Sequence, residues 1–139
     1  MRKGFTIIEL VIVMTVLTII IGISIPKIKG MQDQANVAKA KGELNTLQAA
    51  VESYNTFNSS FPADISSTLV NATPQIVNSV LTDPFNTYSQ NYAYYTTNGY
   101  YIIFSLGTCR LSTITGISSS GVLQGSKGCN ICVTNGTGC

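Results

Sequence analysis

Residues 1–30 read MRKGFTIIELVIVMTVLTIIIGISIPKIKG, and this stretch decides the fold. Between Phe5 and Pro26 the only charged side chain is that of Glu9. As a helix, this run would be about 33 Å long at ~1.5 Å per residue, which matches the hydrocarbon core of a bilayer. The sequence therefore predicts a membrane-spanning helix over this run.

Glu9 is the exception within the apolar run. An ionised carboxylate in hydrocarbon costs roughly 2.5 kcal/mol or more, so such a group normally has a partner and a function. The nearest cation in the chain is Lys3, which lies outside the run. A cut after Gly4 would create a positive amine on Phe5, four residues before Glu9. That amine could neutralise Glu9 of the same chain or of a neighbouring copy, and the second option would set the stagger between packed helices.

The segment Lys3-Gly4-Phe5-Thr6-Ile7-Ile8-Glu9-Leu10 closely resembles the processing signal of type IV pilins and of type II secretion pseudopilins. In that family a membrane peptidase cuts after the glycine and methylates the new N-terminal phenylalanine. The resemblance implies a leader over residues 1–4, a cut after Gly4, methylation of Phe5 and a role for Glu9 in assembly.

Two other interpretations of the N-terminal segment stay open. A conventional secretory signal has a basic start, an apolar middle and small residues at its cut site, and Gly22-Ile23-Ser24 is a passable site. Against it, the apolar run is long and carries a carboxylate near its start. The second alternative is a signal anchor that is not cleaved.

The composition fits an exported subunit that packs against copies of itself. Charged residues are 10% of the chain, against about 25% in an average soluble protein. The precursor has 8 basic and 6 acidic residues, so removal of Arg2 and Lys3 leaves six of each and no net charge. No basic face is evident, and we expect no specific nucleic-acid binding. The chain has no histidine, which excludes histidine-based catalytic triads and most catalytic metal sites, and we expect no enzymatic activity.

One long helix is predicted over residues 5–57, with a membrane-spanning half at 5–26 and an amphipathic half at 27–57. Gly22 and Pro26 mark its weakest part, because proline removes a backbone hydrogen bond. In the second half, apolar residues recur at helical spacing and predict a buried stripe; they are Ala40, Leu44, Leu47, Val51 and Tyr54. Lys39 and Glu43 form an i,i+4 pair on the polar side.

Residues 58–139 predict a small globular β domain, so the expected fold class is α+β, with the helix packed against an antiparallel sheet. Asn98-Gly99 predicts a hairpin between strands at 90–96 and 100–106, and residues 111–117 are a third candidate strand. A short helix is expected over residues 73–81, with Thr73 as its N-cap and Pro74 in its first turn. Residues 118–139 are rich in Gly, Ser and Asn and show little strand pattern.

The four cysteines are Cys109, Cys129, Cys132 and Cys139. In an exported chain they should pair, and short loops favour Cys109–Cys129 with Cys132–Cys139, although three pairings are possible. The rival interpretations of the C-x-x-C at residues 129–132 are a four-thiolate zinc site and a redox dithiol.

The turn Asp83-Pro84-Phe85 and the run at residues 101–107 resemble the C-terminal half of major pseudopilins. Those proteins usually carry an acidic calcium-binding loop after Ser-Leu-Gly. Here Cys109 and Arg110 follow, and no acidic residue occurs after Asp83. Because calcium prefers several oxygen ligands including carboxylates, we expect no metal and no cofactor, with disulfides as the clamp.

The residues and the resemblance together imply a structural subunit of a type IV pilus or of a type II secretion pseudopilus, without separating the two. The precursor would cross the inner membrane once, with Arg2 and Lys3 in the cytoplasm and the C-terminal domain outside, before joining an extracytoplasmic or cell-surface filament. The implied partners are copies of the chain, membrane lipid before assembly, a prepilin peptidase, an assembly ATPase and an inner-membrane platform protein. The alternatives are a membrane-anchored redox or zinc module that uses the four cysteines and a secreted binding domain with a conventional signal.

Overall fold

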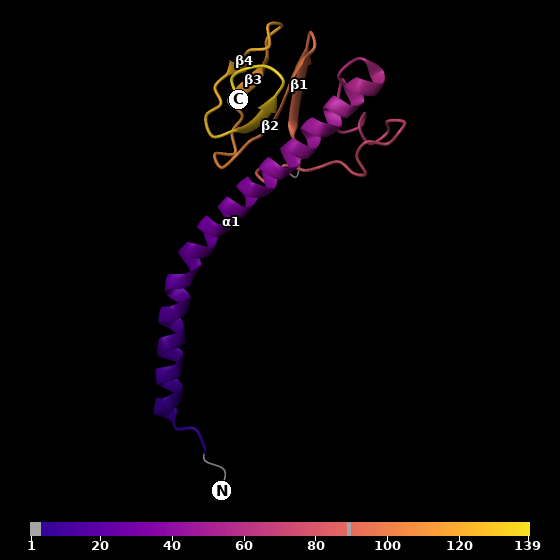
Figure 1. The fold of residues 1–139 in the computed structure, drawn as a ribbon. Coiled ribbons are helices and arrows are strands. Elements are labelled where there is room, and N and C mark those ends of the chain that lie inside the picture. The colour runs from indigo at the N-terminus through magenta and orange to yellow at the C-terminus, as the bar shows by residue number, and fades with distance from the viewer. Residues whose placement is uncertain (1–3, 89) are drawn as a thin grey trace. The chain divides into compact units, whose positions relative to one another are not determined.

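The computed structural model describes residues 4–88 and 90–139 and shows an α+β chain, as the sequence predicts (Figure 1). It divides into two compact units, Met1–Ala35 and Asn36–Cys139. In chain order the elements are α1 (Ile7–Asn58), β1 (Ala93–Thr97), β2 (Tyr100–Ser105), β3 (Ile114–Ile117), β4 (Leu123–Gly125) and β5 (Ile131–Thr134).

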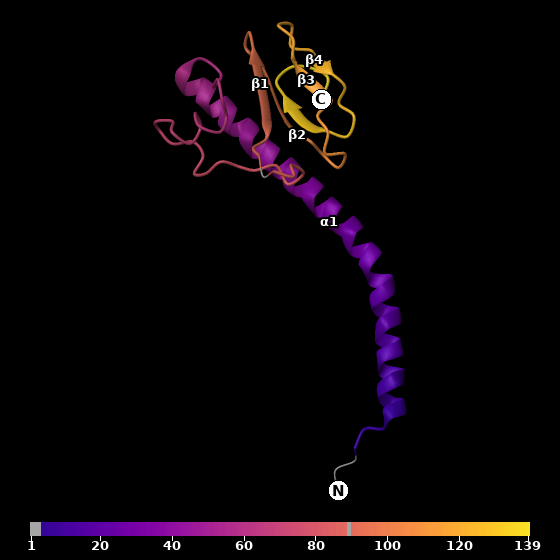
Figure 2. The same ribbon diagram turned by 180° about the vertical axis from the view of Figure 1, so that it is seen from behind.

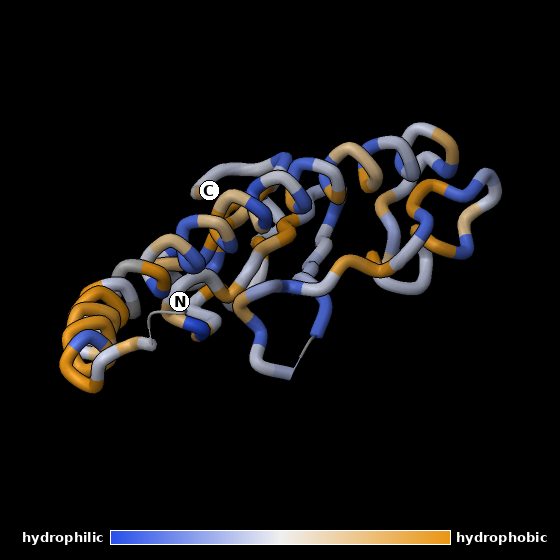
Figure 3. Tube along the Cα trace, turned by 90° about the horizontal axis from the view of Figure 1, so that it is seen from below, coloured by the Kyte–Doolittle hydropathy of each residue, from blue (hydrophilic) through white to orange (hydrophobic). Residues whose placement is uncertain are grey.

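From Ile7 to Ile23, α1 is apolar on all sides except at Glu9 and a few small or hydroxyl residues, and this end of the helix is mostly orange in Figure 3. Among the described residues, α1 is the one helix long and apolar enough to cross a membrane. The helix passes through Gly22 and Pro26 without interruption. A weakness at these two residues therefore stays a prediction, as do the segment boundaries at 4, 26 and 57.

The second half of α1 packs on the sheet, and β1 and β2 lie beside it in both views (Figures 1 and 2). The predicted apolar stripe is confirmed, since Ala40, Leu44, Leu47 and Val51 are buried and Tyr54 is half-buried. From the sheet, Tyr101 and Ile103 of β2 enter the same core.

The predicted ion pair on the polar side of α1 is also confirmed. The Lys39 ammonium lies 3.7 Å from the Glu43 carboxylate.

The main sheet has the strand order β1-β2-β5 with antiparallel pairing throughout, and β3 and β4 form a second, two-stranded sheet. The hairpin at Asn98-Gly99 is confirmed, because Thr97 pairs with Tyr100 and both turn residues have positive φ, 48° and 80°. Such φ values belong to the type of tight turn that suits the twist of two antiparallel strands.

The short helix predicted for residues 73–81 is wrong. The segment is irregular, and the backbone N–H groups of Ile76 and Val77 both donate to the Leu69 carbonyl. Both side chains also pack against the main core. Contacts with the preceding turn and the core therefore replace the i→i−4 bonds that a helix would need.

The expectation of little strand structure in residues 118–139 is also wrong, because β4 and β5 lie there. Strand β5 pairs with β2 and completes the main sheet. Ile131 and Val133 face the main core, whereas Cys132 between them packs against a second cluster around Phe104 and Ile114. This alternation is the signature of a strand with both faces covered.

Candidate functional site

The start of α1 forms the first candidate site. Thr6 is its N-cap, since the Thr6 hydroxyl accepts a hydrogen bond of 3.4 Å from the Glu9 N–H and the Thr6 carbonyl accepts one of 3.2 Å from the Leu10 N–H. Glu9 is therefore the third residue of the helix. Sequence reasoning missed the role of Thr6, although Thr-x-x-Glu before an apolar run is a recognised start signal for helices.

The electrostatics of this end favour a carboxylate. The first turn of a helix carries a partial positive charge, which stabilises an acidic side chain there. Glu9 is exposed and forms no ion pair with another residue of the described ranges. Its carboxylate is thus positioned at a helix end and open to a cation from outside.

Gly4 and Phe5 precede the helix, and the Phe5 side chain is 79% exposed. A Cβ added to Gly4 would meet no atom within 4 Å. Packing against the described residues therefore does not require glycine at this position.

The apolar side chains that follow Phe5 are unpartnered. From Ile7 to Ile23 every large apolar side chain is between 48% and 85% exposed. Burial of apolar surface contributes about 25 cal/mol per Å², so this half of α1 requires either lipid or other apolar helices around it.

The cysteines lie at the other end of the chain. The structure pairs Cys109 with Cys129 and Cys132 with Cys139, the pairing that the sequence favoured. No cysteine is free, and the two cysteines of the C-x-x-C belong to different disulfides. Within the described residues no three His, Cys, Asp or Glu side chains gather as a metal site. This arrangement does not favour a zinc module or a redox dithiol.

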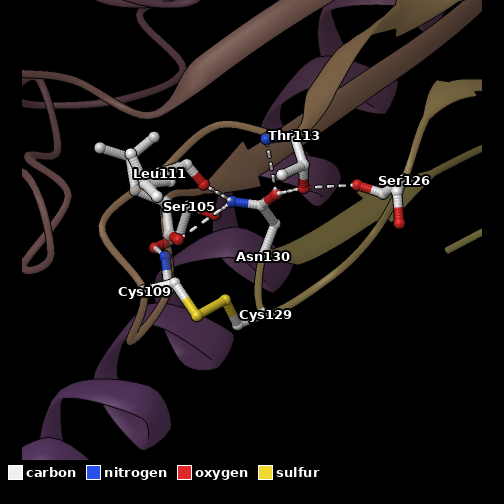
Figure 4. Close-up of a disulfide and its surroundings, with 9 residues drawn as sticks. Ser105, Cys109, Leu111, Thr113, Ser126, Cys129 and Asn130 are labelled. Atoms are coloured by element: carbon white, nitrogen blue, oxygen red, sulfur yellow. Dashed lines mark hydrogen bonds between the residues drawn. A yellow bond between two sulfur atoms is a disulfide. The ribbon is translucent and has the colours of Figure 1, made fainter.

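Asn130 holds the loop beside the first disulfide (Figure 4). Its side chain is 3% exposed, and the amide nitrogen donates to the carbonyls of Ser105, Leu106 and Leu111 at 3.3, 3.0 and 2.8 Å. Its amide oxygen accepts from the N–H and hydroxyl of Thr113 at 3.2 and 2.7 Å. The clamp expected from disulfides alone therefore includes a buried amide that sequence reasoning missed.

Asp83 fixes the same loop from the other side. Its buried carboxylate accepts hydrogen bonds from the Phe85 N–H, the Ser105 hydroxyl and the Leu106 N–H, all between 2.7 and 3.0 Å. Gly107 then turns with a φ of 65°, and a Cβ there would lie 1.9 Å from the Cys129 carbonyl oxygen. Only glycine fits this turn, because both the φ and the close approach exclude a side chain.

Two tyrosines form hydrogen bonds with α1, one from the residue just before β1 and one from β2. The Tyr92 hydroxyl donates to the Glu43 carboxylate at 2.5 Å, and the Tyr101 hydroxyl donates to the Glu52 carboxylate at 2.7 Å. Burial and these carboxylates raise the pKa of both tyrosines above the usual value of 10. Burial also raises the pKa of Tyr94, to about 12. The tyrosines thus serve as packing and hydrogen-bonding groups.

Comparison with known proteins bears on the N-terminal site. Residues 1–25 match the family model described as the prokaryotic N-terminal methylation motif. The chain carries this motif. Within the motif lie Gly4, Phe5, Thr6 and Glu9, the residues at the capped start of α1.

The chain is also similar to parts of curated proteins. Over 62 residues the chain is 34% identical to the type II secretion system core protein G of Pseudomonas aeruginosa, an alignment that covers 45% of this chain and 44% of the relative. Over 94 residues it is 30% identical to the protein of the same name from Vibrio cholerae, covering 66% and 58%. The alignments thus span less than two thirds of these relatives. No solved structure matches the chain.

Proposed function

We propose that the chain is the structural subunit of an extracytoplasmic pilus-like filament. The observation that carries the proposal is the methylation motif over residues 1–25, which includes the start of a helix whose large apolar side chains from Ile7 to Ile23 are exposed. The similarity to type II secretion core proteins favours a secretion pseudopilus over a type IV pilus.

The proposed assembly depends on two properties of α1, the methylation motif at its start and the exposed apolar side chains along its first half. The precursor rests in the inner membrane through its apolar half, and a prepilin peptidase cuts after Gly4 and methylates Phe5. The apolar helices then pack against one another, which keeps their surface away from water when they leave the lipid. In this step Glu9 of one copy binds the Phe5 amine of the next and sets the register. An assembly ATPase and a membrane platform protein would drive the transfer.

The cut is tested by mass spectrometry of the mature protein. We expect a chain that starts at methylated Phe5, and Gly4→Glu should leave the precursor uncut. A mature chain that starts at Ile25 would instead support a secreted domain with a conventional signal, and a retained Met1 would support an uncleaved anchor.

The register is tested with Glu9→Gln, which keeps the shape of the side chain and removes its charge. We expect normal insertion and cleavage but a filament yield reduced at least about tenfold, because an uncompensated buried amine remains at each contact. The matched control is Thr18→Val, since among the described residues the Thr18 hydroxyl bonds to the Met14 carbonyl of its own helix, at 2.8 Å, and to no other group. Full yield from the Glu9 variant would refute the role of its charge.

A further inference from the structure

Four of the six acidic side chains have a partner among the described residues of the chain. Glu9 is assigned above to the neighbouring Phe5 amine, and Asp33 forms no ion pair or side-chain hydrogen bond with any other described residue. The other four carboxylates have partners. Glu43 pairs with Lys39 and accepts a hydrogen bond from Tyr92, and Glu52 accepts one from Tyr101. Asp64 accepts hydrogen bonds from Ser66 and Ser67, and Asp83 accepts them from Phe85, Ser105 and Leu106.

A groove in the second unit offers the complementary charge. It encloses about 570 Å³ between α1 and the loop that carries the disulfides. Val37, Ile131 and Val133 contribute apolar lining, and the lining also includes Lys41 of α1 and Lys127 of the loop that carries the disulfides. Both lysines are exposed.

The two lysines differ in their contacts within the chain. Lys127 donates to the Cys139 carbonyl at 2.7 Å, which fixes its ammonium beside the groove. Lys41 forms no ion pair with a described acidic residue. A groove lined by apolar residues and two lysines fits a carboxylate carried on a helix.

The helical turn around Asp33 has that form. Gly30 lies one turn earlier on the same side of α1, and a Cβ built there would meet nothing within 4 Å. Gly30 leaves one side of the turn beside Asp33 without a side chain, so that side can approach a groove wall closely, whereas Lys29, also one turn earlier, carries a long side chain.

The register proposed for assembly would bring Asp33 of one copy and the groove of the next copy to a similar position along the filament. A Glu9–Phe5 contact shifts one copy against the next by four residues, which would be about 6 Å at ~1.5 Å per residue once the segment from Phe5 is helical in the filament. The same shift places Asp33 of one copy level with Val37 of its neighbour. Helical side chains lean toward the N-terminus, so Lys41, one turn further on, points back toward that level.

We infer that Asp33 of one copy binds between Lys41 and Lys127 of a second copy of this chain and forms a second register contact, above the membrane-spanning segment. This inference rests on the proposed filament. It identifies the groove as an interface between copies, with the carboxylate as the group recognised.

Charge exchange in the full-length chain tests the contact. Asp33→Lys and Lys41→Asp should each lower the yield of filaments at least about tenfold, whereas co-expression of the two variants should restore it to within about threefold of wild type. Only a contact between copies allows this rescue, since each variant supplies the charge that the other lacks. The matched control is Gln34→Lys, which adds a positive charge at the neighbouring exposed position and should leave the yield unchanged. Processed subunit in the membrane fraction, measured by immunoblot, shows that each variant folds and inserts.

A second measurement needs no variant. Carbodiimide joins carboxylates to amines that are in contact, so wild-type filaments grown from mixed ¹⁴N- and ¹⁵N-labelled subunits should yield a mixed-isotope peptide joining Asp33 to Lys41 or Lys127. Filaments that cross-link elsewhere but never at this pair, or normal assembly of Asp33→Lys, would overturn the inference. Wild-type cells without any filament would instead refute the proposed function itself.

Discussion

Replacement of Asn130 tests whether one buried amide holds the C-terminal loop. Asn130→Ala removes the donor to the carbonyls of Ser105, Leu106 and Leu111 and the acceptor of the Thr113 N–H and hydroxyl. Asn130→Asp keeps the shape but replaces the donating nitrogen by an oxygen. The first variant leaves buried groups unpaired, and the second also brings a negative charge up to carbonyl oxygens.

The expected loss of stability follows from the number of hydrogen bonds that the Asn130 amide can form. It has two N–H groups and an oxygen that accepts twice, so about four hydrogen bonds are at stake at ~1 kcal/mol net each. We expect Asn130→Ala to lower the free energy of unfolding by about 4 kcal/mol, a large part of the 5–15 kcal/mol typical of a domain. Asn130→Asp should lower it further at neutral pH, because an unpaired buried charge costs more than a missing bond.

The assay is urea unfolding of the full chain in detergent, followed by near-ultraviolet circular dichroism, since the chain has 7 tyrosines and no tryptophan. The control is Asn135→Ala, which should cost about 1–2 kcal/mol, because within the described part of the chain its exposed amide bonds just two groups, the Tyr101 N–H and the Gly99 carbonyl.

The pH dependence separates the two variants of Asn130. Burial beside carbonyls would raise the pKa of the new carboxyl group above its unfolded value of about 3.9, so Asn130→Asp should be most stable below that pH and lose stability as the pH rises through the folded pKa. Asn130→Ala should show no such change. A loss below about 1 kcal/mol in both variants, or equal stability of the Asp variant at pH 4 and pH 7, would refute the reasoning.

Two further predictions concern the contacts that hold the sheet and its loops. Tyr101→Phe removes the hydrogen bond to Glu52 and should lower the free energy of unfolding by about 1–2 kcal/mol in the same urea titration; because the folded pKa of this tyrosine is raised, the wild type should lose stability as the pH rises above 10, and the variant should lose less. Serine replacement of the Cys109–Cys129 pair, with its separation of 20 residues, should cost about 3.3 kcal/mol, against about 2.4 kcal/mol for the Cys132–Cys139 pair with its separation of 7. A reversed order of the two urea midpoints would contradict the loop-entropy argument.

Elements with local signals were predictable from the sequence. The apolar stripe from Ala40 to Tyr54 needs only helical periodicity, and the turn at Asn98-Gly99 needs only residues that accept positive φ. The short helix expected at residues 73–81 also had local signals, but there the contacts of Ile76 and Val77 with Leu69 and the core prevailed.

Strand β5 shows why the rest of the fold was not predictable. The strand has only the four residues Ile131-Cys132-Val133-Thr134, and glycines lie close on both sides of it. Its cysteine belongs to the C-x-x-C at residues 129–132, which favours an interpretation as a metal or redox loop. The strand exists because β2 offers it a partner at residues 102–105, nearly 30 positions earlier in the chain. Nothing in a short window of sequence encodes such a pairing.

The two candidate sites differ in the same way. Glu9 could be proposed from sequence because a single charge in an apolar run is anomalous in any context, and its role in assembly stays a prediction; the capping role of Thr6 had a local signal that could have been recognised. Asn130 had none. Its partners lie 17 to 25 residues away, so its role appears only when the loop has closed around it.

The capped start of α1 gives a physical reason why the proposed cleavage would promote assembly. In the precursor, Thr6 caps the helix and Glu9 lies where the helix dipole favours a negative charge. A cut after Gly4 would add a positive amine at Phe5, beside a helix end that is already partly positive, at a cost of about 0.3–1 kcal/mol. The amine therefore gains most from a carboxylate, and in lipid the gain is larger than in water because the dielectric constant is low. Since every cut copy carries one such amine and one exposed Glu9, a line of copies can satisfy each amine with the carboxylate of its neighbour, whereas an uncut copy has no amine at Phe5 to offer.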